Sequence, residues 1–387
     1  MNIGILKESL AIGGTERSAA NISKALAQSH SVYMMLYDAG NIKYSYGGEV
    51  INFNRPPKKT FAGKILNSFV RDIKLRSIIK AKKINILYTF TAIGNLQTRL
   101  KYKNVIKIIS ARDYGKMSKN HESYHKALNN SDAMICNSNY IKEFYVSLYP
   151  EHKDRVFSVY NIIDSKEIIA QSKEQPNQAF MDFLSEHPQT IVSVGRFCPE
   201  KGFEYMLEAF SLARKNNPRL GLVLVGDGEL KGRYLEIIEK LCIKDYVFFT
   251  GYQKNPYKYL ARCSAFVLSS VSEGFPNVLA EAMTLRLPVI AANCLSGPAE
   301  ILRNDMNYDA VKDRFELCDY GIITPRFTNG DNAAQIRELS CAIDTLLSSP
   351  ELMTRYAELS EKRAAVYSGE AAGIKLNEIF DMLKRRR

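Results

Sequence analysis

Short apolar runs alternate with amphipathic helical patterns along almost the whole chain, and this alternation restricts the possible folds more than any other feature. A repeated strand–helix order predicts parallel sheets joined by crossover helices, hence an α/β fold. The candidate strands are Ile3–Leu6, Ser31–Leu36, Ile84–Phe90, Val105–Ser110, Ala133–Cys136, Val156–Tyr160, Thr190–Val194, Gly221–Val225, Val247–Thr250, Ala265–Leu268 and Pro288–Ala292.

The length of 387 residues exceeds what one ordinary core supports, so two domains are expected. The polar stretch 171–188 carries Pro176 and Pro188 and is interpreted as the linker between a first domain, 1–170, and a second, 189–367. Two α/β domains of this kind usually bind ligands in the cleft between them.

Composition excludes several classes of protein. The seven cysteines are scattered and form no C-x-x-C, which argues against a disulfide framework and a structural zinc site. The chain begins with too short an apolar run for a secretory signal, and no stretch approaches the roughly 20 apolar residues of a membrane span. A soluble or peripheral protein with reduced thiols is expected.

The net charge of +12 is concentrated between Arg55 and Lys107, where Asp72 is the only acid. Nucleic acid, an anionic bilayer, a phosphorylated substrate or simply a solvated face would account for it. Within this region 61–83 forms an amphipathic pattern, with apolar residues such as Phe61, Ile65 and Phe69 near helical spacing. A membrane-surface helix is one interpretation; we expect instead that the apolar face packs on the first domain, leaving a basic face able to contact lipid headgroups.

Two loops carry residues suited to binding an anion. Gly13 and Gly14 follow the first strand and precede a helix, so backbone N–H groups there can approach a phosphate, although a tight turn explains them equally well. Arg196 and Lys201 follow a strand of the second half, at the edge where parallel sheets bind ligands, and can converge on a diphosphate.

The segment Gly226-Asp227-Gly228 resembles a dinucleotide-binding loop, with Asp245 at about the distance of a ribose-binding acid. It does not follow the first strand, and its acids would lie beside a pyrophosphate, so an oxidoreductase is disfavoured.

Glu273 and Glu281 flank the turn Gly274-Phe275-Pro276-Asn277. The first carboxylate is expected in a loop and the second inside the helix that follows Val278, so that they address different parts of one extended ligand. The chain has no D-x-D, no H-E-x-x-H and no Walker motif, which disfavours metal-dependent transfer of the single-domain type and phosphoryl transfer on a P-loop.

These motifs together resemble family 4 glycosyltransferases of the GT-B fold, in a bacterial branch that builds surface polysaccharides such as capsule or O-antigen. The resemblance follows the chain order over nearly its whole length, and its specific motifs lie in the second half. It implies two Rossmann-like domains with parallel sheets, with a final helix at 368–387 crossing back onto the first domain. It also implies transfer of a hexose or N-acetylhexosamine from a UDP-sugar with retention of anomeric configuration, without a metal or other cofactor.

Carried over residue by residue, the resemblance gives Arg196 and Lys201 the donor diphosphate, Glu281 the ribose and Glu273 the sugar hydroxyls. Glu273 would act with the turn that follows it, Gly274, Phe275, Pro276, Asn277 and Val278. Tyr252 and Gln253 would lie near the base, and Gly13 and Gly14 would close over the donor.

One place departs from the family pattern. Where many members carry a histidine, this chain has Arg112 and Asp113, either of which would then contact the sugar. The implied partners are a lipid-linked saccharide acceptor and an anionic membrane surface, at the cytoplasmic face of the cell membrane, and no nucleic acid. A sugar-nucleotide epimerase, another GT-B enzyme such as a phosphorylase, and a non-catalytic nucleotide-sugar-binding subunit stay as alternatives.

Overall fold

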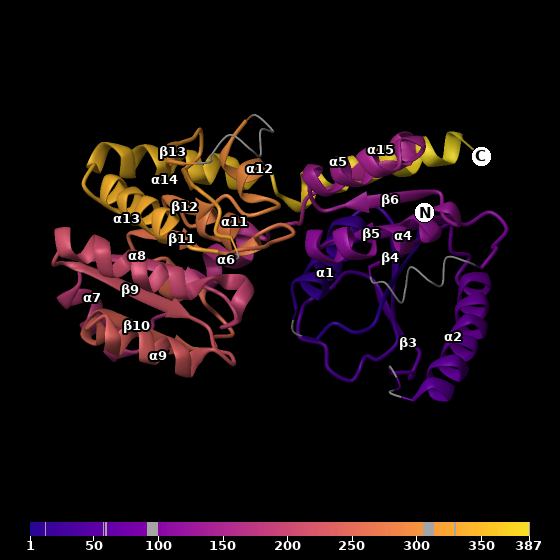
Figure 1. Cartoon of the computed structure of the whole chain (residues 1–387). Helices are drawn as coiled ribbons and strands as arrows, with labels where there is room; N and C mark the ends of the chain where they lie inside the picture. Colours follow the sequence, from indigo (N-terminus) through magenta and orange to yellow (C-terminus); the bar gives the residue numbers. More distant parts are fainter. Residues whose placement is uncertain are drawn as a thin grey trace. The chain divides into compact units, whose positions relative to one another are not determined.

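The computed structural model describes residues 1–386 except 12, 57, 59, 91–99, 305–312 and 329, and it leaves out the side chains of 61, 62 and 64. The chain divides into two units, the first made of Met1–Ile162 and Tyr367–Arg387 and the second of Ile163–Val366 (Figure 1). Each unit is an α/β domain around its own parallel sheet, as the alternating sequence pattern predicted.

The first unit contains a seven-stranded sheet in the order β3-β2-β1-β4-β5-β6-β7, with every neighbouring pair parallel. Its strands are β1 (Asn2–Lys7), β2 (Ser31–Leu36), β3 (Glu49–Asn52), β4 (Ile86–Thr89), β5 (Ile106–Ala111), β6 (Ala133–Cys136) and β7 (Val156–Ser158). Its described helices are α1 (Gly14–Ala27), α2 (Phe61–Ala81), α4 (Tyr114–Asn129), α5 (Asn139–Leu148), the 3-10 helix η1 (Pro150–Arg155) and α15 (Gly369–Arg385).

Alternate residues of these strands enter two different cores because successive side chains point to opposite faces of a sheet. Ile3 and Ile5 of β1 pack with α1 and α15, whereas Leu6 of the same strand packs with α2. Helices α4 and α5 cover the β5 and β6 part of the sheet, on the side of Ile109 and Met134. The sheet is thus buried on both faces, which explains why its strands are continuous apolar runs.

The second unit repeats this plan with the strand order β10-β9-β8-β11-β12-β14-β13, in which only the short β13 is antiparallel. Its strands are β8 (Gln189–Val194), β9 (Leu220–Val225), β10 (Val247–Gly251), β11 (Ala265–Leu268), β12 (Val289–Ala292), β13 (Glu316–Leu317) and β14 (Ile322–Thr324). Its described helices are α6 (Ser165–Ser172), α7 (Gln178–Glu186), η2 (Pro199–Lys201), α8 (Phe203–Asn216), α9 (Lys231–Lys240), η3 (Lys244–Tyr246), α10 (Tyr257–Leu260), α11 (Asn277–Thr284), α12 (Pro298–Leu302), α13 (Ala333–Leu347) and α14 (Pro350–Ala365).

The structure places the boundary between the units at Ile162/Ile163 and not in the stretch 171–188 interpreted as a linker. That stretch contains α7, whose Phe180 and Phe183 are buried against Phe248 of β10. The prediction was wrong because prolines on both sides of α7 and many polar residues are typical of a linker. The two buried aromatic side chains make this segment part of the second unit instead. The final helix α15 belongs to the first unit, where its buried Phe380 joins the core beside α1.

Helix α2 forms over almost the predicted residues, but its expected packing is wrong. Ile65, Phe69 and Ile73 are more than half exposed, whereas Asn67 and Arg71 of the opposite face are buried. The two polar side chains find partners inside: the Asn67 amide donates to the Pro56 carbonyl at 2.6 Å, and the Arg71 guanidinium donates to the Arg55 carbonyl. Satisfied hydrogen bonds remove most of the cost of burying these groups.

Candidate active site

In the second unit the loops after β8 and β11 meet at the carboxyl edge of the sheet. The strand order reverses between these two neighbours, since the chain continues from β8 to β9 on one side and returns to β11 on the other. Such a topological switch point is where open α/β sheets bind their ligands. Six of the predicted site residues lie in these two loops: Arg196, Lys201, Glu273, Gly274, Phe275 and Pro276.

An ion pair joins the two loops. The Lys201 ammonium lies 2.6 Å from a Glu273 carboxylate oxygen, and the Ser270 hydroxyl donates to that same oxygen at 2.8 Å. Burial by itself lowers the pKa of Lys201, but the negative charge of Glu273 and its hydrogen bond raise it above its ordinary value. The Lys201 ammonium therefore stays charged at the switch point, where both side chains are partly shielded from water.

Backbone contacts fix the position of each partner. Gly202 ends η2 with φ of +59°, and a Cβ there would lie 2.3 Å from the Ser269 carbonyl, so the two loops approach closely only with glycine at this place. The Ser269 hydroxyl donates to the Lys201 carbonyl at 3.0 Å. The amide of Val271 donates to the Glu200 carbonyl at 2.9 Å. The ion pair is thus held by main-chain geometry on both sides.

The segment Gly226-Asp227-Gly228 packs against the loop after β8. A Cβ on Gly226 would lie 1.9 Å from the Gly195 carbonyl, and one on Gly228 would lie 2.5 Å from that of Phe197. The amide of Phe197 also donates to the Asp227 carbonyl at 2.9 Å. Close packing of two loops accounts for these glycines, which fits the sequence argument against a dinucleotide-binding loop.

Glu281 lies in α11 and is 2% exposed. The Tyr257 hydroxyl of α10 donates to its carboxylate at 3.2 Å. The sequence motifs gave Tyr257 no role in the site, although it lies shortly after Tyr252 and Gln253, which were predicted to lie near the base. Tyr252 is 60% exposed, and the Gln253 side-chain amide donates to the Thr250 carbonyl at 2.7 Å.

The turn after Glu273 is braced by the loop after β12. The Ser296 amide donates to the Glu273 carbonyl at 2.9 Å, and its hydroxyl donates to the Gly274 carbonyl at 2.7 Å. Phe275 and Pro276 are buried, and Asn277 and Val278 begin α11 half-buried. The segment Ser296–Ile301 therefore supports the predicted sugar-binding turn.

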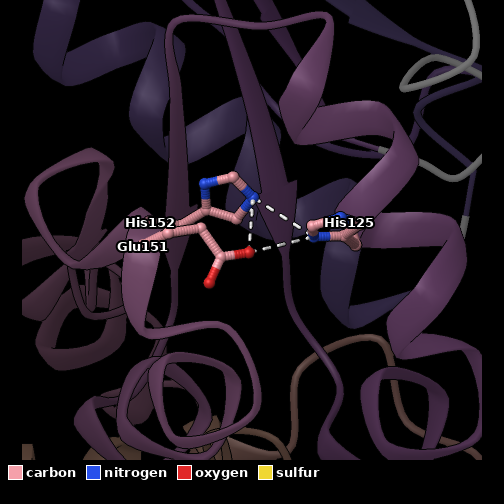
Figure 2. A group of neighbouring side chains, drawn as sticks. All are labelled: His125, Glu151 and His152. Atoms are coloured by element: carbon pink, nitrogen blue, oxygen red, sulfur yellow. Dashed lines mark hydrogen bonds and ion pairs between the residues drawn. The ribbon is translucent and has the colours of Figure 1, made fainter.

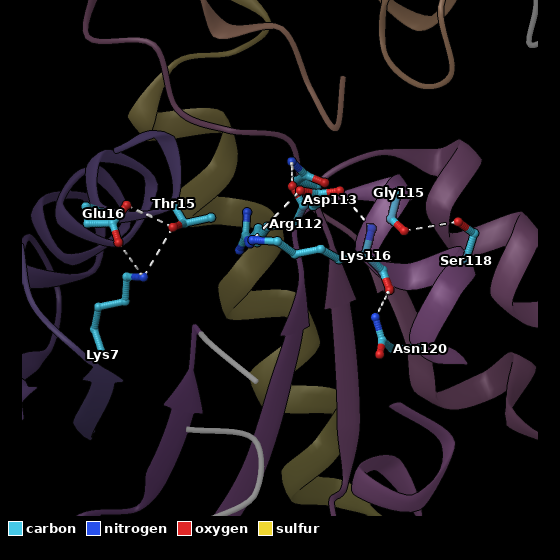
Figure 3. A network of polar contacts seen from close by, with 10 residues as sticks. Lys7, Thr15, Glu16, Arg112, Asp113, Gly115, Lys116, Ser118 and Asn120 are labelled. Atoms are coloured by element: carbon cyan, nitrogen blue, oxygen red, sulfur yellow. Dashed lines mark hydrogen bonds and ion pairs between the residues drawn. The ribbon is translucent and has the colours of Figure 1, made fainter. Parts of the chain in front are cut away.

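In the first unit, Lys7 ends β1 and is 1% exposed, and it lies 2.9 Å from Glu16 in the first turn of α1 (Figure 3). Burial alone raises the pKa of Glu16, but the hydrogen bond and charge of Lys7 outweigh it and lower that pKa. Sequence reasoning missed this pair. Gly13 caps α1 and its amide donates to the Tyr44 hydroxyl at 3.2 Å; around Gly14, a Cβ would meet nothing within 4 Å.

Arg112 and Asp113 follow β5, and both have internal partners (Figure 3). The Arg112 guanidinium is buried and donates to the Tyr88 hydroxyl at 2.6 Å and the Asn161 side-chain oxygen at 3.2 Å. The Asp113 carboxylate accepts from the Lys116 amide at 2.9 Å and caps α4. Their suggested contact with a sugar stays a prediction; local packing already explains why each residue is held in place.

Another polar cluster joins His125 of α4 to Glu151 and His152 of η1 (Figure 2). Among the described residues, this is the one group of three histidine, cysteine or acidic side chains that converge closely enough to suggest a metal. His125 Nδ1 lies 3.2 Å from His152 Nε2, and Arg155 lies 2.7 Å from His152 Nδ1. Arginine only donates hydrogen bonds, so Nδ1 of a neutral His152 is the acceptor for Arg155 and the ring proton lies on Nε2. Nε2 then donates to His125 Nδ1. This arrangement fits a hydrogen-bonded pair of histidines better than a metal site.

Two comparisons of sequence place this chain among known proteins. The family model described as Glycosyltransferase Family 4 matches residues 12–167, and the one described as Glycosyl transferases group 1 matches residues 174–312. An uncharacterised glycosyltransferase of Haemophilus influenzae is 25% identical over 371 residues, which cover 94% of this chain and 92% of that one.

A second relative has a described activity. The N-acetylgalactosamine-N,N'-diacetylbacillosaminyl-diphospho-undecaprenol 4-alpha-N-acetylgalactosaminyltransferase of Campylobacter jejuni is 27% identical over 322 residues, 78% of this chain and 84% of that one. Among solved structures, Anabaena Alr3699/HepE in complex with UDP and glucose superposes with a TM-score of 0.73 at 17% identity, over 99% of this chain and 100% of that one. At this identity the structural likeness shows the fold alone.

The two α/β units and the loops at their switch points define a glycosyltransferase with the GT-B fold. The chain belongs to the family 4 glycosyltransferases. Other relatives are named for amylovoran biosynthesis in Erwinia amylovora and for lipopolysaccharide core biosynthesis in Rhizobium meliloti.

Proposed function

We propose that this glycosyltransferase moves a hexose or N-acetylhexosamine from a UDP-sugar to a lipid-linked saccharide during synthesis of a bacterial surface polysaccharide. The observation that carries the proposal is the Lys201–Glu273 ion pair at the switch point of the second unit. The Campylobacter jejuni relative, named for transfer to a diphospho-undecaprenol-linked sugar, supports the class of acceptor. The Anabaena structure, which holds UDP and glucose on this fold, supports the class of donor.

In this proposal, Arg196 and Lys201 bind the donor diphosphate. Arg196 is exposed and its side chain has Cys198 as a hydrogen-bond partner, whereas Lys201 is held by Glu273. As the bond from sugar to phosphate breaks, negative charge grows on the leaving diphosphate, and fixed cations stabilise it more than they stabilise the intact donor. Two cations would thereby supply the stabilisation for which other glycosyltransferases use a metal ion.

Glu273 and the main chain from Gly274 to Pro276 would hold the sugar hydroxyls, and Glu281 the ribose. The Glu273 carboxylate, held by Lys201 at 2.6 Å, offers oxygen atoms that accept hydrogen bonds from hydroxyl groups. We further propose that the anomeric configuration is retained by front-side attack, in which the leaving phosphate accepts the proton of the acceptor hydroxyl. No carboxylate then has to serve as a base.

The experiment is a transfer assay with UDP-, GDP- and ADP-sugars and a polyprenyl-diphosphate-linked saccharide, with the anomeric proton of the product read by NMR. Transfer from a UDP-sugar with retention and without added metal is expected. Replacing Arg196 or Lys201 with Ala should lower turnover at least about tenfold, the effect of losing about 1.4 kcal/mol of charge stabilisation. Lys240→Ala, on an exposed face of α9, is the control.

Several outcomes would overturn parts of the proposal. Full activity in both Arg196→Ala and Lys201→Ala would remove the phosphate assignment. Loss of activity on adding EDTA, restored by a divalent ion, would overturn metal-independent transfer. An isomerised UDP-sugar formed without acceptor would indicate an epimerase instead.

We also propose that the protein works at the cytoplasmic face of the cell membrane, bound to an anionic bilayer through its basic first unit. Among the described residues, no helix is both long enough and apolar enough to cross a membrane. The excess of positive charge between Arg55 and Lys107 supports surface attachment.

A further inference from the structure

Helix α2 presents an apolar stripe to solvent. Ile65 is 57% exposed, Leu66 63%, Phe69 64% and Ile73 53%, and these residues recur at helical spacing on one side of the helix. Isolated exposed apolar residues are ordinary, but four neighbours on one helix face mark an interaction surface. No other helix in the described part of the chain exposes so many large apolar side chains together.

The rotation of α2 about its own axis is fixed by contacts on the face opposite the apolar stripe. On the opposite face, Arg71 lies 3.9 Å from the centre of the Tyr37 ring and donates to the Arg55 carbonyl. Further along, Leu75 and Ile79 are buried in the core with residues of β1, β2 and β4. Turning the apolar stripe inward would expose these groups and break the buried hydrogen bonds.

The same face of α2 continues into a basic pocket. Arg76 and Lys80 follow Ile73 at helical spacing and are exposed. They line a cavity of about 420 Å³ with Lys83, Lys101 and Lys103, and none of the described residues that line it is acidic. Tyr102 also lines this cavity, and the Arg76 guanidinium lies 5.6 Å from the centre of its ring. Five cations around one hollow create a positive potential that attracts an anion such as a phosphate.

This basic pocket is separate from the predicted site residues of the first unit. Asn85 and Val105 line it, and they immediately precede β4 and β5, so the pocket lies at the amino edge of the sheet. Lys7 ends β1 and Arg112 follows β5, so both lie at the carboxyl edge. A ligand in the basic pocket would therefore not occupy the predicted acceptor side.

We propose that the α2 stripe (Ile65, Leu66, Phe69 and Ile73) and the basic pocket (Arg76, Lys80, Lys83, Lys101 and Lys103) form one docking surface for an anionic lipid bilayer. The apolar side chains would enter the boundary between headgroups and acyl chains, and the cations would bind lipid phosphates. The only acid of α2, Asp72, is buried, so the exposed face carries no negative charge to oppose this. A second copy of the chain fits worse, because its own cations would meet these five.

This docking surface rests on the proposed attachment to a membrane, and it specifies which residues contact the bilayer. The test is flotation of the full chain with vesicles of phosphatidylcholine alone or with 30% phosphatidylglycerol added. One variant carries Phe69→Ser and Ile73→Ser, and another carries Lys80→Gln, Lys83→Gln and Lys101→Gln. The matched controls are Ile374→Ser, an exposed apolar residue of α15, and the triple variant Lys215→Gln, Lys240→Gln and Lys244→Gln on the second unit.

The wild-type chain should float with the anionic vesicles and much less with the neutral ones. Each lysine removed from the pocket should weaken binding about fivefold, and the Phe69/Ile73 variant should weaken it at least about tenfold. The controls should bind nearly as the wild type does. Melting temperatures of the variants should match the wild type, because all of the substituted side chains are exposed.

Equal losses in the pocket and control triple variants would overturn the proposal, because only general charge would then matter. So would a Phe69/Ile73 variant that changes the sedimentation coefficient but not vesicle binding, since the stripe would then join two copies of the chain. Failure of the proposed transfer reaction is distinguishable: Lys201→Ala should keep vesicle binding, and the α2 variants should keep the shift in melting temperature caused by UDP-sugar.

Discussion

The Lys201–Glu273 pair makes the stability of the site depend on having both partners. The Glu273 side chain is only 12% exposed, so Lys201→Ala leaves a carboxylate with little water and without its cation. We expect the free energy of unfolding to fall by about 3 kcal/mol. Adding Glu273→Ala should recover part of that loss, since the uncompensated charge is then removed. Urea denaturation of the two single variants and the double variant measures the coupling, and strictly additive effects would contradict it.

Two glycines give opposite predictions for the same substitution. Gly226 has φ of +150° and its new Cβ would lie 1.9 Å from a carbonyl oxygen, so Gly226→Ala should destabilise the chain by more than about 1 kcal/mol. Gly14 opens α1 with free space around it, so Gly14→Ala should be neutral or stabilising by about 0.5 kcal/mol.

Gly14→Ala also tests the role that the family resemblance gives to this residue. If Gly14 closes over the donor, the added methyl group should raise the KM for the UDP-sugar without lowering the melting temperature. An unchanged KM would indicate that Gly14 only starts the helix. Because stability and donor binding are predicted to change separately, thermal melting and steady-state kinetics on the same variant distinguish the two roles.

At the scale of elements, the contact between α4 and η1 is predicted to weaken in acid. Burial, and then the charge of Arg155, lower the pKa of His152 below its ordinary value of 6.5. The unfolded chain therefore takes up the proton first as pH falls, and stability present above pH 6.5 is lost progressively below it. His152→Asn keeps an acceptor for Arg155 and should make the melting temperature less sensitive to pH between 7 and 5. The same slope in wild type and variant would refute this role, and His30→Asn is the control.

Sequence periodicity predicted most of the strands and missed three short ones, β3, β13 and β14. Strands β2, β6 and β11 begin and end at the predicted residues, because strands buried on both faces read as continuous apolar runs. Strand β3 at the edge of its sheet was missed: Glu49–Asn52 is short and half polar. The two-residue β13, at the edge of the other sheet, was missed for the same reason. Strand β14 is buried and lies between β12 and β13, but its three residues are too few to show a periodic pattern. Their pairing depends on neighbours distant in sequence, and no local pattern contains that information.

For helix α2, the sequence pattern predicted the helix but not which of its faces packs inward. Its spacing gave the helix and its two faces, but the choice of the inward face depended on Tyr37 and on the carbonyl groups of Arg55 and Pro56. At the site, motif order predicted that Arg196, Lys201 and Glu273 belong to one edge of a sheet. It did not predict that Lys201 and Glu273 pair directly, since that follows from the strand order β8-β11, which the sequence does not show.

At the scale of the whole molecule, the last helix of the chain packs into the first unit, which is otherwise formed by residues 1–162. Phe380 of α15 is fully buried in the first unit's core with residues of α1, although the preceding 200 or so residues form the second unit. Phe380→Ala should therefore destabilise the first unit by about 3–5 kcal/mol and leave the second unchanged. Ile374→Ala in the same helix, at a side chain 56% exposed, should have little effect.

Calorimetry can assign this effect if UDP is used to mark the second unit. At 100 times its dissociation constant, UDP should add about 2.7 kcal/mol to the unit that binds it and raise only that transition. Phe380→Ala should lower the other transition, the one that does not respond to UDP. If the variant instead lowers the UDP-responsive transition by the same amount, the two units unfold together. The helix that closes the chain would then stabilise both units, and its removal would impair donor binding in addition to the fold of the first unit.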